Sequence, residues 1–170
     1  RWTTLDTGVQ DDLWWVTVTD GTVFMAGENG TILLHDPAVG AAFNRMDTPT
    51  DVTLFGIYAA TPQDAWAVGF TPTDLEGDSV ILRYDGANWS QVGFPEGVSP
   101  KTDLFKVWGR AADDVYIVGR DGLILHYDGV SLSKVNAPDP DWVTVTGTDE
   151  GIVLVGGAQL GALATLKDGQ

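Results

Sequence analysis

Residues 104–129 have the sequence LFKVWGRAADDVYIVGRDGLILHYDG, and residues 54–86 repeat the same order of motifs as LFGIYAATPQDAWAVGFTPTDLEGDSVILRYDG. Two weaker copies flank this pair, one before it and one after it. The chain therefore holds four copies of a repeat of roughly forty residues, and a fixed period of this length is typical of solenoids and propellers. The copies cover approximately residues 12–46, 53–92, 103–135 and 141–170.

Each copy contains three short runs of β-branched and aromatic residues, and a fourth run follows an Asp-Gly turn. This order predicts a four-stranded antiparallel meander. The second run is almost wholly apolar, as in residues 115–118, so it needs cover on both faces. Sheets stacked face to face around an axis supply that cover, so we predict an all-β propeller of four-stranded blades in a single domain, residues 1–170. The glycines that end the second runs predict a tight turn or a close backbone approach; they are Gly27, Gly69, Gly119 and Gly156.

Two other architectures fit the repeat less well. No segment has the three-and-four spacing of apolar residues that a helical solenoid requires. A β-sandwich holds as many strands but does not predict the same ordered motif four times. Within the propeller class, four repeats allow a four-bladed ring, half of an eight-bladed dimer, or an arc of a larger propeller.

The two ends of the chain match in phase. Residues 168–170 followed by residues 1–2 give Asp-Gly-Gln-Arg-Trp, with the spacing of residues 85–89. A random cut through such an array would match in phase only about once in forty trials. We therefore expect residues 1–6 to be the closing strand of the blade formed by residues 142–168, in the same chain or in a neighbouring copy. The rival explanation is a piece excised from a larger propeller at a repeat boundary.

The repeat order Leu-Phe-x-x-Trp/Tyr, Asp-x-Trp/Tyr-x-Val-Gly and Ile-Leu-x-Tyr-Asp-Gly-x-x-Trp resembles the β-propeller repeats of exported bacterial proteins. It is similar in pattern to the Asp-box (BNR-like) families, which include sialidase-like propellers and the photosystem II stability factor family. The resemblance implies a secreted, periplasmic or cell-surface propeller that serves in binding, scaffolding or hydrolysis.

Composition narrows the classes of partner. The formal charge is −15, from 24 acidic and 9 basic residues, so nucleic acid and anionic membranes are repelled. The absence of cysteine excludes disulfides, thiolate metal sites and a cysteine nucleophile. No apolar run reaches the roughly 20 residues that a membrane-spanning helix needs.

The residues that could carry catalysis do not converge in the repeat. The arginines that a sialidase clamp would need fall at different phases of the repeat; they are Arg1, Arg45, Arg83, Arg110 and Arg120. We expect His35 and His126 to occupy the same repeat position, at the end of the third run, which indicates a structural polar residue rather than a zinc pair. We predict no catalytic residue, no metal site and no cofactor; partial calcium ligation by the acids of residues 74–78 is the minority alternative.

The seven tryptophans include a candidate for ligand contact. Trp14, Trp66, Trp108 and Trp142 occupy repeated strand positions, so we expect them in the core. Trp15 is replaced by Gly56, Lys106 and Thr144 in the other copies, so it is the tryptophan predicted to face a ligand or the central channel.

The loop between the second and third runs is predicted to lie on the binding rim, because variable loops carry function more often than the repeated frame. The second copy has an insertion there, residues 70–78, and its candidate contacts are Phe70, Asp74, Leu75 and Glu76. Arg120 occupies the short equivalent loop of the third copy. We therefore predict a non-enzymatic propeller that recognises a protein or a carbohydrate through this rim, with a homodimer as one assembly; the alternative is a sialidase-like glycoside hydrolase or lyase.

Overall fold

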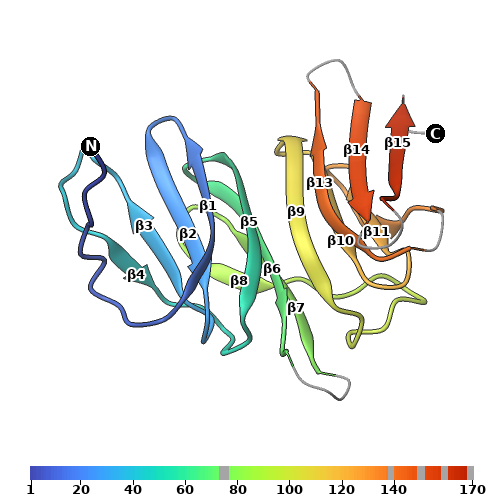
Figure 1. Cartoon of the computed structure of the whole chain (residues 1–170), viewed down its shortest axis with the longest axis horizontal. Helices are drawn as coiled ribbons and strands as arrows, with labels where there is room; N and C mark the ends of the chain where they lie inside the picture. Colours follow the sequence, from blue (N-terminus) through green and yellow to red (C-terminus); the bar gives the residue numbers. More distant parts are fainter. Residues whose placement is uncertain (73–76, 138–139, 149–151, 158–160, 168–170) are drawn as a thin grey trace.

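The computed structural model describes residues 1–72, 77–137, 140–148, 152–157 and 161–167. Its strands form four antiparallel sheets, one for each sequence repeat, so the predicted all-β propeller architecture is confirmed (Figure 1). The described part of the chain contains no helix that could span a membrane.

Each sheet is a meander in which consecutive strands are neighbours. Blade 1 consists of β1 (Leu13–Thr19), β2 (Thr22–Gly27), β3 (Ile32–His35) and β4 (Asn44–Met46). Blade 2 consists of β5 (Leu54–Thr61), β6 (Asp64–Phe70), β7 (Ser79–Tyr84) and β8 (Trp89–Gln91). Blade 3 consists of β9 (Leu104–Ala111), β10 (Asp114–Gly119), β11 (Ile124–Tyr127) and β12 (Leu132–Lys134). Blade 4 consists of β13 (Trp142–Gly147), β14 (Ile152–Gly157) and β15 (Leu163–Lys167).

The core lies between the blades, as the apolar second strands require. Three hydrophobic clusters fill the junctions between blades 1 and 2, 2 and 3, and 3 and 4. Their largest fully buried members include Phe24, Trp66 and Trp142. The first strands β1, β5, β9 and β13 contact one another in sequence and line the inner face (Figure 1).

The four blades form an open arc, with blade 1 and blade 4 at opposite ends (Figure 1). Residues 1–6 form no strand in this chain, and Trp2 is fully exposed. Closure within a single chain, one of the two routes predicted for residues 1–6, is therefore wrong for this structure. Pairing of residues 1–6 with a neighbouring copy stays a prediction.

In blades 1, 2 and 3, glycine is required at or next to the end of the second strand. A Cβ at Gly69 would overlap the carbonyl oxygen of Thr53, and Gly27 and Gly119 meet the equivalent backbone oxygens. The predicted close approach is thus confirmed for these three glycines. In blade 4 the equivalent residue is Gly157 and not Gly156, because Trp142 pairs with Gly157 as Leu54 pairs with Gly69.

Candidate binding site on the inner face

A β-bulge near the start of the first strand occurs in every blade. The pairing register skips one residue after Leu13, Leu54, Leu104 and Trp142. A bulge leaves its extra residue out of the ladder and re-aims its side chain. The residues set free in this way are Trp14, Phe55, Phe105 and Val143.

Three of these side chains form an aromatic band with Phe70, which ends β6. The ring centroids of Trp14 and Phe55 are 5.5 Å apart, and those of Phe55 and Phe70 are 4.6 Å apart. Phe70 then meets Phe105 edge to face at 5.5 Å. The aromatic band, defined as these four residues, therefore crosses blades 1, 2 and 3 at one end of their first strands.

Lys106 and Trp15 lie beside the band. The Lys106 ammonium nitrogen is 3.3 Å from the centre of the Trp15 ring and donates a 3.2 Å hydrogen bond to the carbonyl oxygen of Phe55. The two side chains meet across Gly56, which occupies the same repeat position in blade 2. Burial lowers the pKa of Lys106 to about 8. The inner face thus holds one cation whose charge is only weakly solvated, next to four aromatic rings.

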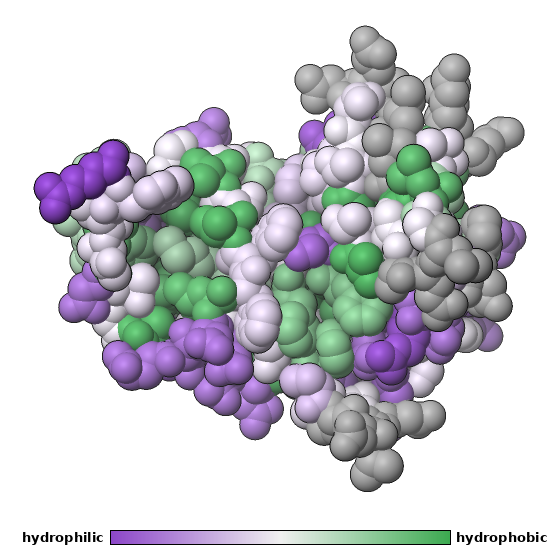
Figure 2. All heavy atoms as spheres, viewed as in Figure 1, coloured by the Kyte–Doolittle hydropathy of each residue, from purple (hydrophilic) through white to green (hydrophobic). Residues whose placement is uncertain are grey.

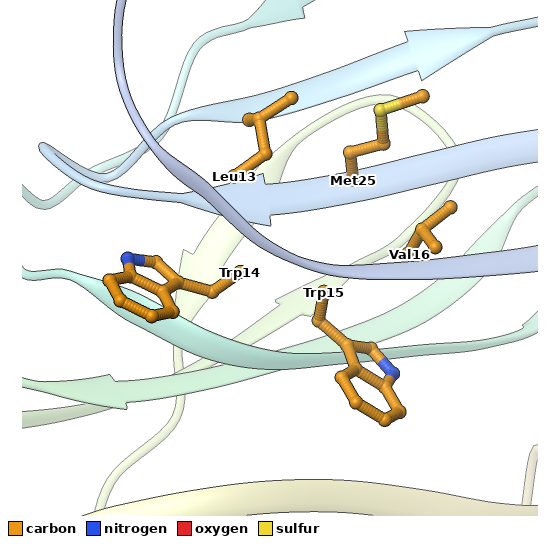
Figure 3. A pocket seen from close by; sticks show the side chains of 5 residues that line it. All are labelled: Leu13, Trp14, Trp15, Val16 and Met25. Carbon is orange, nitrogen blue, oxygen red and sulfur yellow. The ribbon is translucent and has the colours of Figure 1, made fainter.

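The surface around the band is apolar and open. Trp14 is 50 % exposed and Trp15 is 42 % exposed, and both point from β1 toward blade 2 (Figure 3). A hollow of about 450 Å³ beside them is also lined by Leu13, Val16 and Met25. Apolar surface gathers over β1 and β2, and again over the starts of β5 and β9 (Figure 2). Large exposed apolar patches of this kind mark interaction surfaces.

The predicted contact residues are divided by the structure. Phe70 and Trp15 lie together on the inner face, in the aromatic band and beside it. Arg120 instead forms a 2.9 Å ion pair with Asp103. Burial raises the pKa of Asp103, and the Arg120 guanidinium opposes this shift. The other predicted contacts, Asp74, Leu75 and Glu76, lie outside the described residues, as does most of the suggested calcium loop.

Sequence reasoning did not single out Trp14, Phe55 and Phe105 as candidate contact residues. Trp14 was expected in the core, yet it is half exposed because the bulge turns it out of the ladder. The spacing of the buried residues carries the signal, since Leu54 and Ile57 share one core cluster although they are three residues apart. In an unbroken strand, residues on one face are separated by two.

The histidines differ in position and in contacts. His126 pairs with Tyr116 and His35 pairs with Val23, so the shared strand position expected for the two histidines is wrong. His126 bonds Asp114 at 2.7 Å and stacks on Tyr116, whereas His35 stacks on Phe43. Each is therefore held by its own blade.

The arginine that shares the position of His126 is Arg83, which bonds Asp64 at 2.9 Å and lies over the Trp66 ring. Asp64 and Asp114 thus bind side chains of the third strand of their own blades. Burial and the Asp114 charge raise the pKa of Tyr116 to about 12.

No arginine clamp is assembled. Arg45, Arg83, Arg110 and Arg120 each pair with a different aspartate; the partners are Asp11, Asp64, Asp114 and Asp103. No group of three or more potential metal ligands occurs within the described ranges. These pairs engage the four arginines separately, and they leave the aromatic band as the strongest candidate for binding.

Comparison with known proteins supports the architecture. No family model matches the sequence, and no curated protein sequence does so. The solved structure "YCF48 bound to D1 peptide" superposes with a TM-score of 0.68 at 12% identity, covering 98% of this chain and 53% of that one. The designed protein Ika8 gives 0.71 at 12% identity over 95% and 48%, and the designed Ika4 gives 0.65 at 16% over 97% and 99%. The chain thus spans about half the length of YCF48 and Ika8, and the likeness establishes the fold alone.

Proposed function

We propose that this chain is a non-catalytic binding propeller that recognises an extended segment of a partner protein along the aromatic band. The observation that carries the proposal is the repeated β-bulge, which presents Trp14, Phe55 and Phe105 on one surface without removing any strand from its ladder. Because the bulged side chains of successive blades lie along one line, they suit an extended ligand.

The chemistry of the band defines the ligand. Aromatic rings supply large contact areas at little cost in side-chain entropy, and they dominate the energetics of protein interfaces. The Lys106 ammonium adds one donor for a carbonyl or carboxylate oxygen. Since the whole chain carries a formal charge of −15, a strongly acidic partner is disfavoured. We therefore expect a neutral or basic peptide with apolar anchor residues.

The comparison with YCF48 supports this proposal in kind. That protein was solved with a D1 peptide bound. Its structure matches nearly the whole length of this chain, which covers about half of YCF48. At 12% identity the residues that contact its peptide do not transfer to this chain. The aromatic band is argued from this chain's own geometry.

A displayed library of random short peptides provides the test. Peptides selected on the wild-type chain should bind Phe105→Ala about tenfold more weakly or worse, because the variant removes the ring that carries the band onto blade 3. Val130→Ala is the matched control, since Val130 is an exposed apolar residue away from the band. Equal affinity of the selected peptides for wild type and Phe105→Ala would exclude the band as the site.

A carbohydrate ligand is the second candidate, and the exposure of Trp14 and Trp15 favours it. Indole faces stack on sugar rings, and these two rings are the exposed indoles of the inner face. A glycan array separates the candidates: signals lost in Trp14→Ala and Trp15→Ala, together with no peptide selected from the library, favour the carbohydrate.

The hydrolase alternative is less well supported. A sialidase-like site needs several arginines converging on one carboxylate, and Arg45, Arg83, Arg110 and Arg120 are instead engaged by separate aspartates. A screen with model glycosides tests this alternative, and turnover abolished by a substitution in the band would replace the binding proposal.

A further inference from the structure

The outer face of blade 1 has the composition of a blade junction but no blade against it. Val16 occupies the repeat position of Ile57 and Val107, which face the preceding blade and are 1% and 2% exposed. Val16 itself is 55% exposed, and its neighbour on the same face, Val18, is exposed as well. The residues that seal a junction elsewhere in the arc are therefore present here and open to solvent.

Residues 2–5 have the sequence of a fourth strand without a sheet. Their order Trp-Thr-Thr-Leu matches Trp-Ser-Gln-Val in residues 89–92 and Leu-Ser-Lys-Val in residues 132–135. Trp89 is 6% exposed, whereas Trp2 and Leu5 are exposed. An aromatic residue that is buried at this position in blade 2 is thus left in solvent at the start of the chain.

Within the part of the chain that the structure describes, blade 4 has no counterpart of the fourth strand that residues 2–5 resemble. In the other blades the third strand pairs with a fourth, but among the described residues β15 pairs only with β14. An open edge of this kind is a template for pairing with another chain. The far face of blade 4 also exposes Leu163 beside Thr144 and Thr165.

We propose that two copies of this chain close into a single eight-bladed ring. Blade 4 of each copy packs on the outer face of blade 1 of the other, and residues 2–5 of that other copy become its fourth strand. The length supports this occupant: the chain covers 48% of Ika8 and 53% of YCF48, so two copies supply about the length of one such propeller chain.

The register of the exchanged strand follows from the repeat. Trp89 lies opposite Tyr84, and the residue of blade 4 equivalent to Tyr84 is Leu166. Trp2 of one copy therefore lies opposite Leu166 of the other, and Thr3 lies opposite Thr165. A two-fold axis makes the two junctions identical, so the assembly closes and leaves no further surface for growth.

Charge repulsion opposes this assembly and makes the dimerisation equilibrium depend on ionic strength. Each copy has a formal charge of −15, so association brings two acidic bodies together while burying apolar faces. Added salt screens the repulsion and does not weaken the apolar contact. The dimer should therefore be favoured as ionic strength rises.

The native mass is the first measurement, by light scattering over a dilution series. We expect twice 18.2 kDa at high concentration, and loss of the dimer in Val16→Asp. Val130→Asp is the matched control, because Val130 is an exposed valine outside both proposed junctions. Both valines are exposed in the single chain, so neither substitution should prevent folding. A single-chain mass at every concentration and salt level, or open polymers of increasing length, would overturn the proposal.

Cross-linking tests the register, and the chain has no native cysteine to interfere. The double variant Thr3→Cys, Thr165→Cys should oxidise to a covalent dimer, because directly opposed residues of neighbouring strands bring their Cβ atoms within about 4.5–5.5 Å. The control pairs Thr3→Cys with Ser90→Cys, an exposed residue of β8 that lies at neither junction. Equal cross-linking in the two variants, or none in either, would contradict the strand exchange.

Discussion

Trp15 of blade 1 and Lys106 of blade 3 meet across Gly56 of blade 2, with the Lys106 ammonium nitrogen 3.3 Å from the centre of the Trp15 ring. Three successive blades therefore share one contact on the inner face. The contact requires the middle blade to have no side chain at this position, and this requirement makes it testable.

Gly56→Ala should destabilise the fold by about 1–3 kcal/mol, the usual cost of overfilling a packed site. A Cβ at this position would lie 3.0 Å from the Val107 amide nitrogen and 3.1 Å from Lys106 Cα, and backbone there has little room to move. Urea denaturation measures the effect. Gly93→Ala is the control, because no atom lies within 4 Å of a Cβ built on Gly93. Equal stability of the two variants would show that the blades adjust freely at Gly56.

Lys106 should titrate with a midpoint near pH 8, because burial disfavours its charged form. The unfolded chain keeps this lysine protonated up to about pH 10.5, so between pH 8 and 10.5 the unfolded state binds more protons and stability rises with pH. Lys106→Met should remove this rise. The Nζ-linked methylene carbon reports the titration by NMR, and a midpoint near the unshifted value would contradict the burial of the ammonium.

Asp114→Ala should lower stability by about 1–2 kcal/mol, because it leaves the His126 ring and the Arg110 guanidinium without their carboxylate. Peptide binding at the aromatic band should be unchanged. Thermal melting and binding of a selected peptide are the two measurements, with the exposed Glu96→Ala as the control. A loss of affinity in Asp114→Ala at unchanged stability would assign this aspartate to the site.

Shortening residues 72–77 to a two-residue turn should weaken ligand binding while leaving the melting temperature nearly unchanged, if the insertion in blade 2 contributes contacts beyond Phe70. The ends of the loop are fixed in the structure, since the Thr71 amide donates to the Asp78 carbonyl at 2.9 Å. Phe70 is retained, so a change in affinity reports on the loop itself. Affinity equal to wild type would confine the site to the aromatic band.

The blades were predictable from the sequence because their determinants recur. Gly27, Gly69 and Gly119 lie at or next to the ends of the second strands and recur at one phase of the repeat, and each is fixed by a backbone oxygen that leaves no room for a Cβ. An apolar second run that needs cover on both faces then leaves few architectures other than stacked sheets. Because the repeat occurs several times, the requirement for glycine at this position could be recognised in the sequence.

Only part of the candidate site could be predicted from the sequence, because its other residues depend on where the pairing between the first and second strands skips a residue. Phe70 was singled out as a candidate from the insertion that follows it, and Trp15 from its variability among the copies; the structure places them in the aromatic band and beside it. Phe55 and Phe105 recur in the repeat, and a recurring aromatic residue in an apolar run is ordinarily buried. Their role depends on the skipped register beside them, and a bulge changes the geometry of a strand without changing its composition.

The bulge also allows the exposed residue to be substituted independently of the buried residues that fold the blade. The residue that it frees has no partner in the strand ladder, so its side chain can vary while the buried Leu54 and Ile57 on either side stay as they are. Such a position tolerates both Trp14 and Val143 in a single chain. After duplication of a blade, a substitution at the bulged position therefore changes the binding surface of that one repeat and leaves its buried core unchanged.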